Sequence, residues 1–70
     1  MKKCDKNIEE TFLLIQQMLH LADKGDKHRE DTGCGIMYGM LRDSAYKIQQ
    51  LAEKEKQAHV EKNGWKNEQD

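Results

Sequence analysis

The chain has 70 residues, 36% of them charged and none of them proline, and its formal net charge at pH 7 is −1. This balance gives no electrostatic basis for binding nucleic acid, and the longest apolar run, FLLI at residues 12–15, is far shorter than the roughly 20 residues that span a bilayer. A core in so short a chain supplies about 3–5 kcal/mol at most, so we expect association to stabilise the fold.

The composition is rich in Leu, Gln, Glu, Lys, Met and Ala, which is typical of helices, and we therefore predict an all-α protein. The first ten residues, MKKCDKNIEE, turn acidic before any apolar run begins, unlike a signal peptide. We expect a cytoplasmic protein with reduced cysteines, no cofactor, no bound nucleic acid and no membrane contact.

The first helix is predicted over residues 7–24. Asn7 and Glu10 have the spacing of a capping box, and Gly25 is typical of the position after a helix end because glycine adopts the left-handed conformation without strain. Apolar residues form a heptad seam and a second line beside it: Ile8, Phe12, Ile15, Leu19 and Ala22, then Leu14, Met18 and Leu21. The two lines together cover an arc of about 180°, more than one neighbouring helix would bury.

A second helix is predicted over residues 32–63, after a polar connection at 25–31 (GDKHRED) and with Asp31 or Thr32 as its cap. No proline or glycine interrupts residues 40–63. Its apolar seam has heptad spacing and a flanking line of other residues: Cys34, Met37, Leu41, Ser44, Ile48 and Leu51, flanked by Tyr38, Ala45 and Ala52.

The end of the second helix is marked by Gly64, which fits the position after the last helical residue. Trp65 then contacts Val60 as a staple across the helix end. We expect a single helical-hairpin domain over residues 1–64, followed at 65–70 by the Trp65 staple and a disordered polar tail.

The seven-residue connection favours an antiparallel hairpin. Pairing about its centre places Leu19 near Tyr38, Phe12 near Ala45 and Ile8 near Gln49, and leaves the chain from about residue 53 onward without an internal partner. This overhang and the wide apolar arc predict a homodimer that forms a four-helix bundle. Its expected core is Ile8, Phe12, Ile15, Leu19, Met37, Leu41, Ile48 and Leu51. The alternatives are a marginal monomer and a chain that folds only against a different protein.

Cys34 is the first candidate for chemistry. In the first turn of a helix, free N–H groups and the helix dipole stabilise a thiolate, whereas its place beside Met37 and Leu41 on the seam favours an inert, buried thiol. The structural role is the preferred interpretation. Cys4 lies at the other end of the hairpin, and a disulfide requires Cα atoms within about 7 Å, so only an intermolecular bond could join the two cysteines.

Two groups of side chains are candidate metal ligands. His20, His28 and Cys34 flank the connection, and Glu55 and His59 are four residues apart on one helix. Neither group contains a Cys-x-x-Cys or His-x-x-x-His pair, so we expect no native metal site, and the first group remains a weak alternative.

A strip of the second helix lies off the apolar seam. Gly35, Gly39, Arg42 and Tyr46 follow steps of four, three and four; we call them the glycine strip. Glycine inside a helix costs about 1 kcal/mol relative to alanine, and glycines four apart let a backbone or ligand come close. We predict a partner or ligand groove in which Arg42 and Tyr46 contact an anionic group or another helix. Alternatively, Gly33 and Gly35 only shape the helix entry, and Gly39 packs against the first helix.

These features predict a small non-catalytic helical interaction or adaptor protein that acts as a homodimer. The alternative is a thiol- or metal-responsive sensor that uses Cys34 with His20 and His28. An enzyme is not expected, because two helices enclose little volume and no paired acid and base lie on one face.

Overall fold

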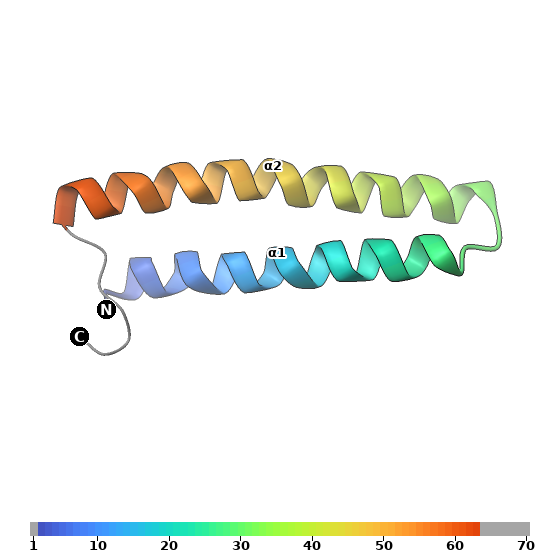
Figure 1. Cartoon of the computed structure of the whole chain (residues 1–70), viewed down its shortest axis with the longest axis horizontal. Helices are drawn as coiled ribbons and strands as arrows, with labels where there is room; N and C mark the ends of the chain where they lie inside the picture. The colour runs from blue at the N-terminus through green and yellow to red at the C-terminus, as the bar shows by residue number, and fades with distance from the viewer. Residues whose placement is uncertain (1, 64–70) are drawn as a thin grey trace.

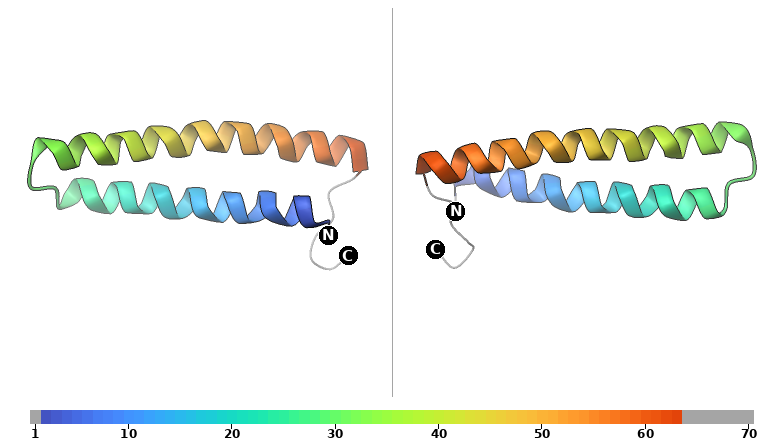
Figure 2. Two further views of the ribbon diagram at one scale, coloured as in Figure 1. Left: turned by 180° about the vertical axis from the view of Figure 1, so that it is seen from behind. Right: turned by 45° about the horizontal axis from the view of Figure 1, so that its top comes forward.

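The computed structural model describes residues 2–63 and contains two α-helices, α1 (Lys3–Lys27) and α2 (Thr32–Asn63), joined by residues 28–31. The helices run antiparallel and lie side by side along the whole of α1, as Figures 1 and 2 both show. The predicted all-α helical hairpin is confirmed, and the second helix has the predicted bounds. The staple at Trp65 and the polar tail lie outside the described residues.

The prediction that the first helix begins at Asn7 is wrong, because α1 begins at Lys3. Lys6 N–H donates to the Lys2 carbonyl at 2.9 Å, and Lys2 gives no side-chain cap. Asn7 instead lies inside the helix, where its carbonyl accepts a 2.9 Å bond from Thr11 Oγ1. The contact of Asp5 with α2 offsets the missing cap, so tertiary packing overrides the capping signal.

The predicted helix end at Gly25 is also wrong, because α1 continues to Lys27. Gly25 lies under the Tyr38 ring of α2, and a Cβ on Gly25 would collide with three atoms of that ring. Here glycine permits a close approach between the helices and not a left-handed turn. The loop therefore has four residues, 28–31, and His28 N–H closes the helix on the Gly25 carbonyl at 3.1 Å.

The longer α1 also corrects the register of the hairpin. Tyr38 packs on Gly25 and not on Leu19, and His59 contacts Asp5 near the other end. The predicted overhang from residue 53 does not exist, since α1 covers α2 as far as His59. The overhang therefore no longer supports a homodimer. The wide apolar arc of α1 supports one only to the extent that the hairpin leaves apolar side chains exposed.

The hairpin core is narrow. Ile15 is the single large side chain that is fully buried among the described residues, and three alanines complete the buried apolar set: Ala22, Ala45 and Ala52. Phe12, Met18 and Leu19 pack partly buried around it. The flanking alanines of α2, and not its predicted seam, therefore face α1 most directly. Small side chains let the helices approach closely. Because the alanines of α2 face α1, the larger residues of the α2 seam lie to one side of the contact.

Asp31 is the cap of α2, and Thr32 is its first helical residue. The Asp31 carboxylate accepts the Cys34 N–H at 2.7 Å, and this hydrogen bond lowers the pKa of Asp31 from its ordinary value of 3.8. The predicted cap at Asp31 or Thr32 is confirmed, and the capping residue is Asp31.

Asp31→Ala should lower the stability of the hairpin at neutral pH, because it removes this cap. Since the pKa of Asp31 is depressed in the folded protein, its contribution is present above pH 3.8 and is lost as the pH falls through the folded value. Urea unfolding followed by circular dichroism should show a difference from wild type at pH 7 that shrinks as the pH is lowered below 3.8. Thr32→Ala is the control and should change the midpoint little; equal effects of both variants would contradict the assignment.

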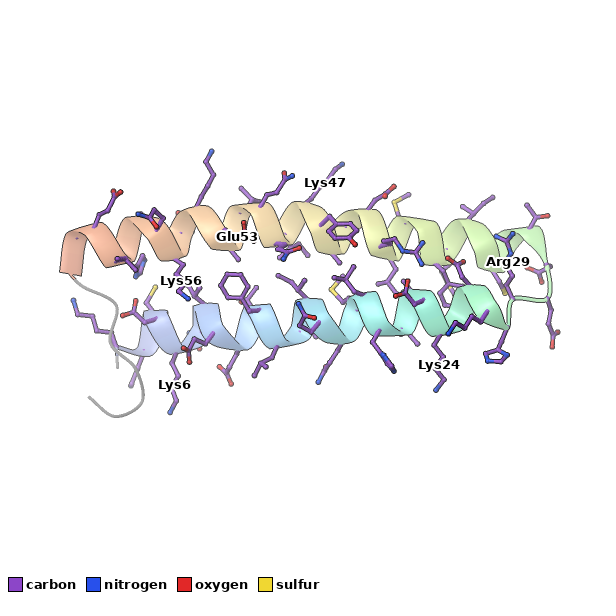
Figure 3. The ribbon with its side chains drawn as sticks, viewed as in Figure 1. Lys6, Lys24, Arg29, Lys47, Glu53 and Lys56 are labelled. Atoms are coloured by element: carbon purple, nitrogen blue, oxygen red, sulfur yellow. The ribbon has the colours of Figure 1, made fainter. Side chains whose placement is uncertain are left out.

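The outer surfaces of both helices carry lysines. Lys6 and Lys24 point away from α2, and Lys47 points away from α1 (Figure 3). Neither helix of the described chain combines the length and the apolar character needed to cross a bilayer. The charged residues therefore define the outside of the hairpin, and the apolar residues that remain exposed stand out against them.

Candidate functional site

One side of the hairpin presents an uncharged surface that both helices share, which we call the apolar face. Its members recur at steps of three and four on each helix: Leu14, Met18 and Leu21 on α1, and Met37, Leu41, Ile48 and Leu51 on α2. Met18 and Leu41 are partly buried, whereas the other five are exposed. Leu51 is 64% exposed, Leu14 56% and Met37 54%.

A hollow of about 220 Å³ shows that the two lines lie on the same side of the molecule. It is lined by Ile8 and Thr11 of α1 and by Ile48, Leu51, Ala52 and Glu55 of α2. Thr11 begins the line that continues through Leu14 and Met18, because it precedes them by three and seven residues. The second apolar line of α1 and the seam of α2 are therefore one continuous surface.

The members of the predicted dimer core divide between two places. Ile15 lies in the hairpin core with Phe12 and Leu19 packed around it, and Ile8 lines the hollow beside the core. Met37, Ile48 and Leu51 are exposed on the apolar face, with Leu41 half-buried between them. The predicted set thus contains both the internal core and part of an external surface, which the sequence pattern did not separate.

The opposite side of the hairpin is polar. One nitrogen of the Arg42 guanidinium lies 2.8 Å from Asp26 Oδ2 and 2.9 Å from Asp23 Oδ1, and these two hydrogen bonds, the Asp26 bond foremost, raise the pKa of Arg42. Further along, the Lys56 ammonium lies 5.9 Å from the centroid of the Phe12 ring. This side is held together by contacts between the two helices.

The residues of the glycine strip lie along this polar side and do not share one environment. Gly35 lies against the Arg29 guanidinium from the loop, and a Cβ there would collide with it. Gly39 faces open space, with no atom within 4 Å of a built Cβ, so it does not pack against α1. Tyr46 is exposed, whereas Arg42 is paired with two aspartates. Arg42 is therefore a link between the helices, and its charge is already paired with two carboxylates, which makes it a weaker anchor for an anionic ligand.

The loop end of the hairpin holds the sensor candidates. Cys34 is half-buried, and its backbone N–H is bonded to Asp31. His20 and His28 line one hollow at the end of α1, together with Asp23, Lys24 and Lys27. Cys34 does not line that hollow, and residues 2–63 contain no group of three His, Cys, Asp or Glu side chains placed to hold a metal ion.

Three residues that the sequence did not bring together meet at the open end of the hairpin, where α1 begins and α2 ends. Cys4 Sγ lies 3.8 Å from His59 Nε2, and His59 Nδ1 lies 2.6 Å from Asp5 Oδ1. The predictions that Cys4 lies before the first helix and that His59 lies on an overhang are both wrong. The available signal was the acidic Asp5, which suits the first turn of a helix that begins near Lys3.

Comparison of the chain with protein-family models, with curated proteins and with solved structures finds no significant match. The geometry of the hairpin is therefore the basis for proposing a function.

Proposed function

We propose that this chain is a small non-catalytic helical interaction protein that acts as a homodimer. In this dimer the apolar face of one hairpin packs on the apolar face of a second copy, which forms a four-helix bundle. The observation that carries the proposal is that exposed large apolar side chains of both helices lie together on one side, among them Leu14, Met37 and Leu51.

The small hairpin core supports a second copy as the occupant. One isoleucine and three alanines are the buried apolar residues of the described chain. Complete burial of an isoleucine contributes about 1.5–3 kcal/mol, and an alanine contributes less, whereas ordering each residue costs about 1–2 kcal/mol. A hairpin with so small a core needs further apolar burial, and its own apolar face is the surface that can supply it.

The charge pattern of the apolar face also favours self-association. The two lines from Thr11 to Leu21 and from Met37 to Leu51 contain no charged residue at the heptad positions. In a two-fold dimer the same surface meets itself, so any charge on it would face a like charge near the axis. The two uncharged lines avoid this repulsion along their length, and a charged residue beside them, Glu55, lines the hollow at their end.

The glycine strip would stay exposed in such a dimer because it lies on the polar side of the hairpin. Its open groups are Gly39 and the exposed Tyr46. An adaptor role would use this outer surface while the apolar face holds the two copies together.

Light scattering coupled to gel filtration tests the proposal. A homodimer has a mass of about 16 kDa, twice the 8.2 kDa of the chain. Thermal unfolding should also shift to higher temperature as the protein concentration rises, because dissociation accompanies unfolding. A folded 8 kDa species with a concentration-independent midpoint would overturn the homodimer.

A further inference from the structure

The contacts at the open end of the hairpin join a nucleophile, a base and a buried carboxylate. Cys4 is exposed, the His59 side chain is 22% exposed, and Asp5 is 3% exposed. His59 is 54 residues from Asp5 and 55 from Cys4 along the chain. Folding of the hairpin is therefore what assembles the three groups, which we call the Cys4 cluster.

The two nitrogens of His59 have different roles in this cluster. When Nδ1–H donates to the Asp5 carboxylate, Nε2 carries the lone pair and can accept the proton of the Cys4 thiol. Burial of Asp5 holds the imidazole ring in this orientation. The thiolate that results is the form of cysteine that reacts as a nucleophile.

The position of Cys4 in α1 also favours the thiolate. Cys4 lies in the first turn, where backbone N–H groups have no acceptor within the helix, and Lys2 gives no side-chain cap. The positive end of the helix dipole lies at this turn of α1. Lys2, Lys3 and Lys6 add positive charge to the same end of the helix.

We propose that Cys4 is a reactive thiol that exchanges with small disulfides bearing carboxylates. His59 Nε2 takes the Cys4 proton, and the sulfur attacks one sulfur of the disulfide. The bond between the two disulfide sulfurs breaks, a mixed disulfide with Cys4 forms, and the leaving thiolate takes the proton from His59. Cys4 is oxidised and the leaving sulfur is reduced, so protons and electrons balance without another reactant.

The proposal goes beyond the homodimer and does not depend on it. Exchange needs an accessible sulfur and a proton acceptor, and the Cys4 cluster supplies both. The lysines near Cys4 favour an anionic disulfide over a cationic one, because opposite charge raises the local concentration of the reactant. Asp5 acts through His59 and is a positioning residue.

Cys34 is a matched control within the same chain. It also lies in the first turn of a helix, but its close polar neighbour is the Asp31 carboxylate, which accepts the Cys34 N–H at 2.7 Å. Cys34 has no imidazole in hydrogen-bond reach among the described residues, whereas the His59 imidazole lies beside Cys4 and can accept its proton. Cys34 is also half-buried whereas Cys4 is exposed, so the variants of His59 and Asp5, and not this comparison alone, isolate the contribution of the cluster.

The test uses two full-length single-thiol proteins, Cys34→Ser and Cys4→Ser, with the anionic reagent 5,5′-dithiobis(2-nitrobenzoate) near about pH 6.5. Cys4 should react at least about tenfold faster than Cys34, because an ordinary thiol is almost fully protonated at that pH. In 8 M urea the two rates should converge. A folded Cys4 that reacts no faster than Cys34, or no faster than Cys4 in urea, would overturn the proposal.

Two substitutions in the Cys34→Ser protein test the roles within the cluster. His59→Gln should slow Cys4 about tenfold, and Asp5→Asn should slow it less and change how its rate depends on pH. The other charged groups of the neighbouring turns include Lys2, Lys3 and Lys6 on α1 and Glu55, Lys56 and Lys62 on α2, and they are unchanged in both variants. Unchanged rates and profiles in variants with native circular dichroism would contradict the assigned roles.

The charge of the disulfide is tested with cystamine, which is cationic. The rate of Cys4 with cystamine, divided by its rate with the anionic reagent, should be smaller in the folded protein than in urea. Added salt should bring the two ratios closer together. A ratio of the two reagents that is the same in folded and unfolded protein would contradict the carboxylate class.

Discussion

Leu14→Glu is expected to convert the proposed homodimer into monomers. Leu14 is 56% exposed in the hairpin and lies near the middle of the apolar face, so the substitution places an unpaired carboxylate inside the proposed interface. The dimer affinity should fall about 100-fold or more, which corresponds to roughly 3 kcal/mol. Light scattering over a dilution series would measure this change.

Leu13→Glu is the matched control for this variant. Leu13 adjoins Leu14 in the chain and is 65% exposed, but it lies with Glu9, Phe12 and Lys56 around a hollow on another side of the hairpin. It should leave the dimer intact, since its side chain does not enter the apolar face. Equal dissociation by the two glutamates would contradict the assigned interface, and so would a Leu14→Glu protein with an unchanged dissociation constant.

Gly25→Ala is expected to destabilise the hairpin by about 1–3 kcal/mol, although alanine is the better helix former. An added methyl group at Gly25 would collide with the Tyr38 ring, so the ring must turn or the helices must separate. Gly39→Ala is the matched variant, and its expected change in stability has the opposite sign. Its methyl group enters open space, and the protein should gain up to about 1 kcal/mol from helix propensity.

Urea unfolding at one fixed protein concentration would measure both glycine variants. The midpoint should fall for Gly25→Ala and rise for Gly39→Ala. A higher midpoint for Gly25→Ala would show that the Tyr38 ring can move away at no cost in stability. It would contradict the close packing of Tyr38 on Gly25. A fall at Gly39 would indicate that another surface packs on it, most simply a second copy in a dimer arranged through the glycine strip.

The fold class was predictable because the apolar residues recur with helical spacing over both segments. The bounds of α1 were not, since Asn7 and Gly25 carry local signals that contacts with α2 override. Asn7 resembles a cap and Gly25 resembles a helix end, yet each lies inside the helix. In the observed pairing Gly25 lies opposite Tyr38, six residues along α1 from the predicted Leu19.

The same errors concealed the Cys4 cluster. A helix that begins at residue 7 leaves Cys4 and Asp5 outside the fold and leaves His59 without a neighbour. Once α1 begins at Lys3, its first turn reaches His59 and the three side chains meet. A shift of four residues at one helix end therefore decided whether the site could be found.

The rotation of α2 was a second point that spacing alone could not decide. Two adjacent lines of α2 could face α1, one with Ala45 and Ala52 and the other with Ile48 and Leu51. Hydrophobicity favours the larger residues, but close packing of two helices favours alanine. The structure buries the alanines and leaves Leu51 64% exposed, and that choice creates the apolar face.

An isotope-filtered nuclear Overhauser experiment on a mixture of labelled and unlabelled chains tests the homodimer most directly. The homodimer predicts contacts between methyl groups of different chains, with Leu14, Met18 and Leu21 meeting Ile48 and Leu51. The side chains of Leu13 and Ile36, which are equally exposed but lie off the apolar face, should show none. Interchain contacts at Leu13 and Ile36, or none from Leu14 and Leu51 in a folded sample, would contradict the proposed interface.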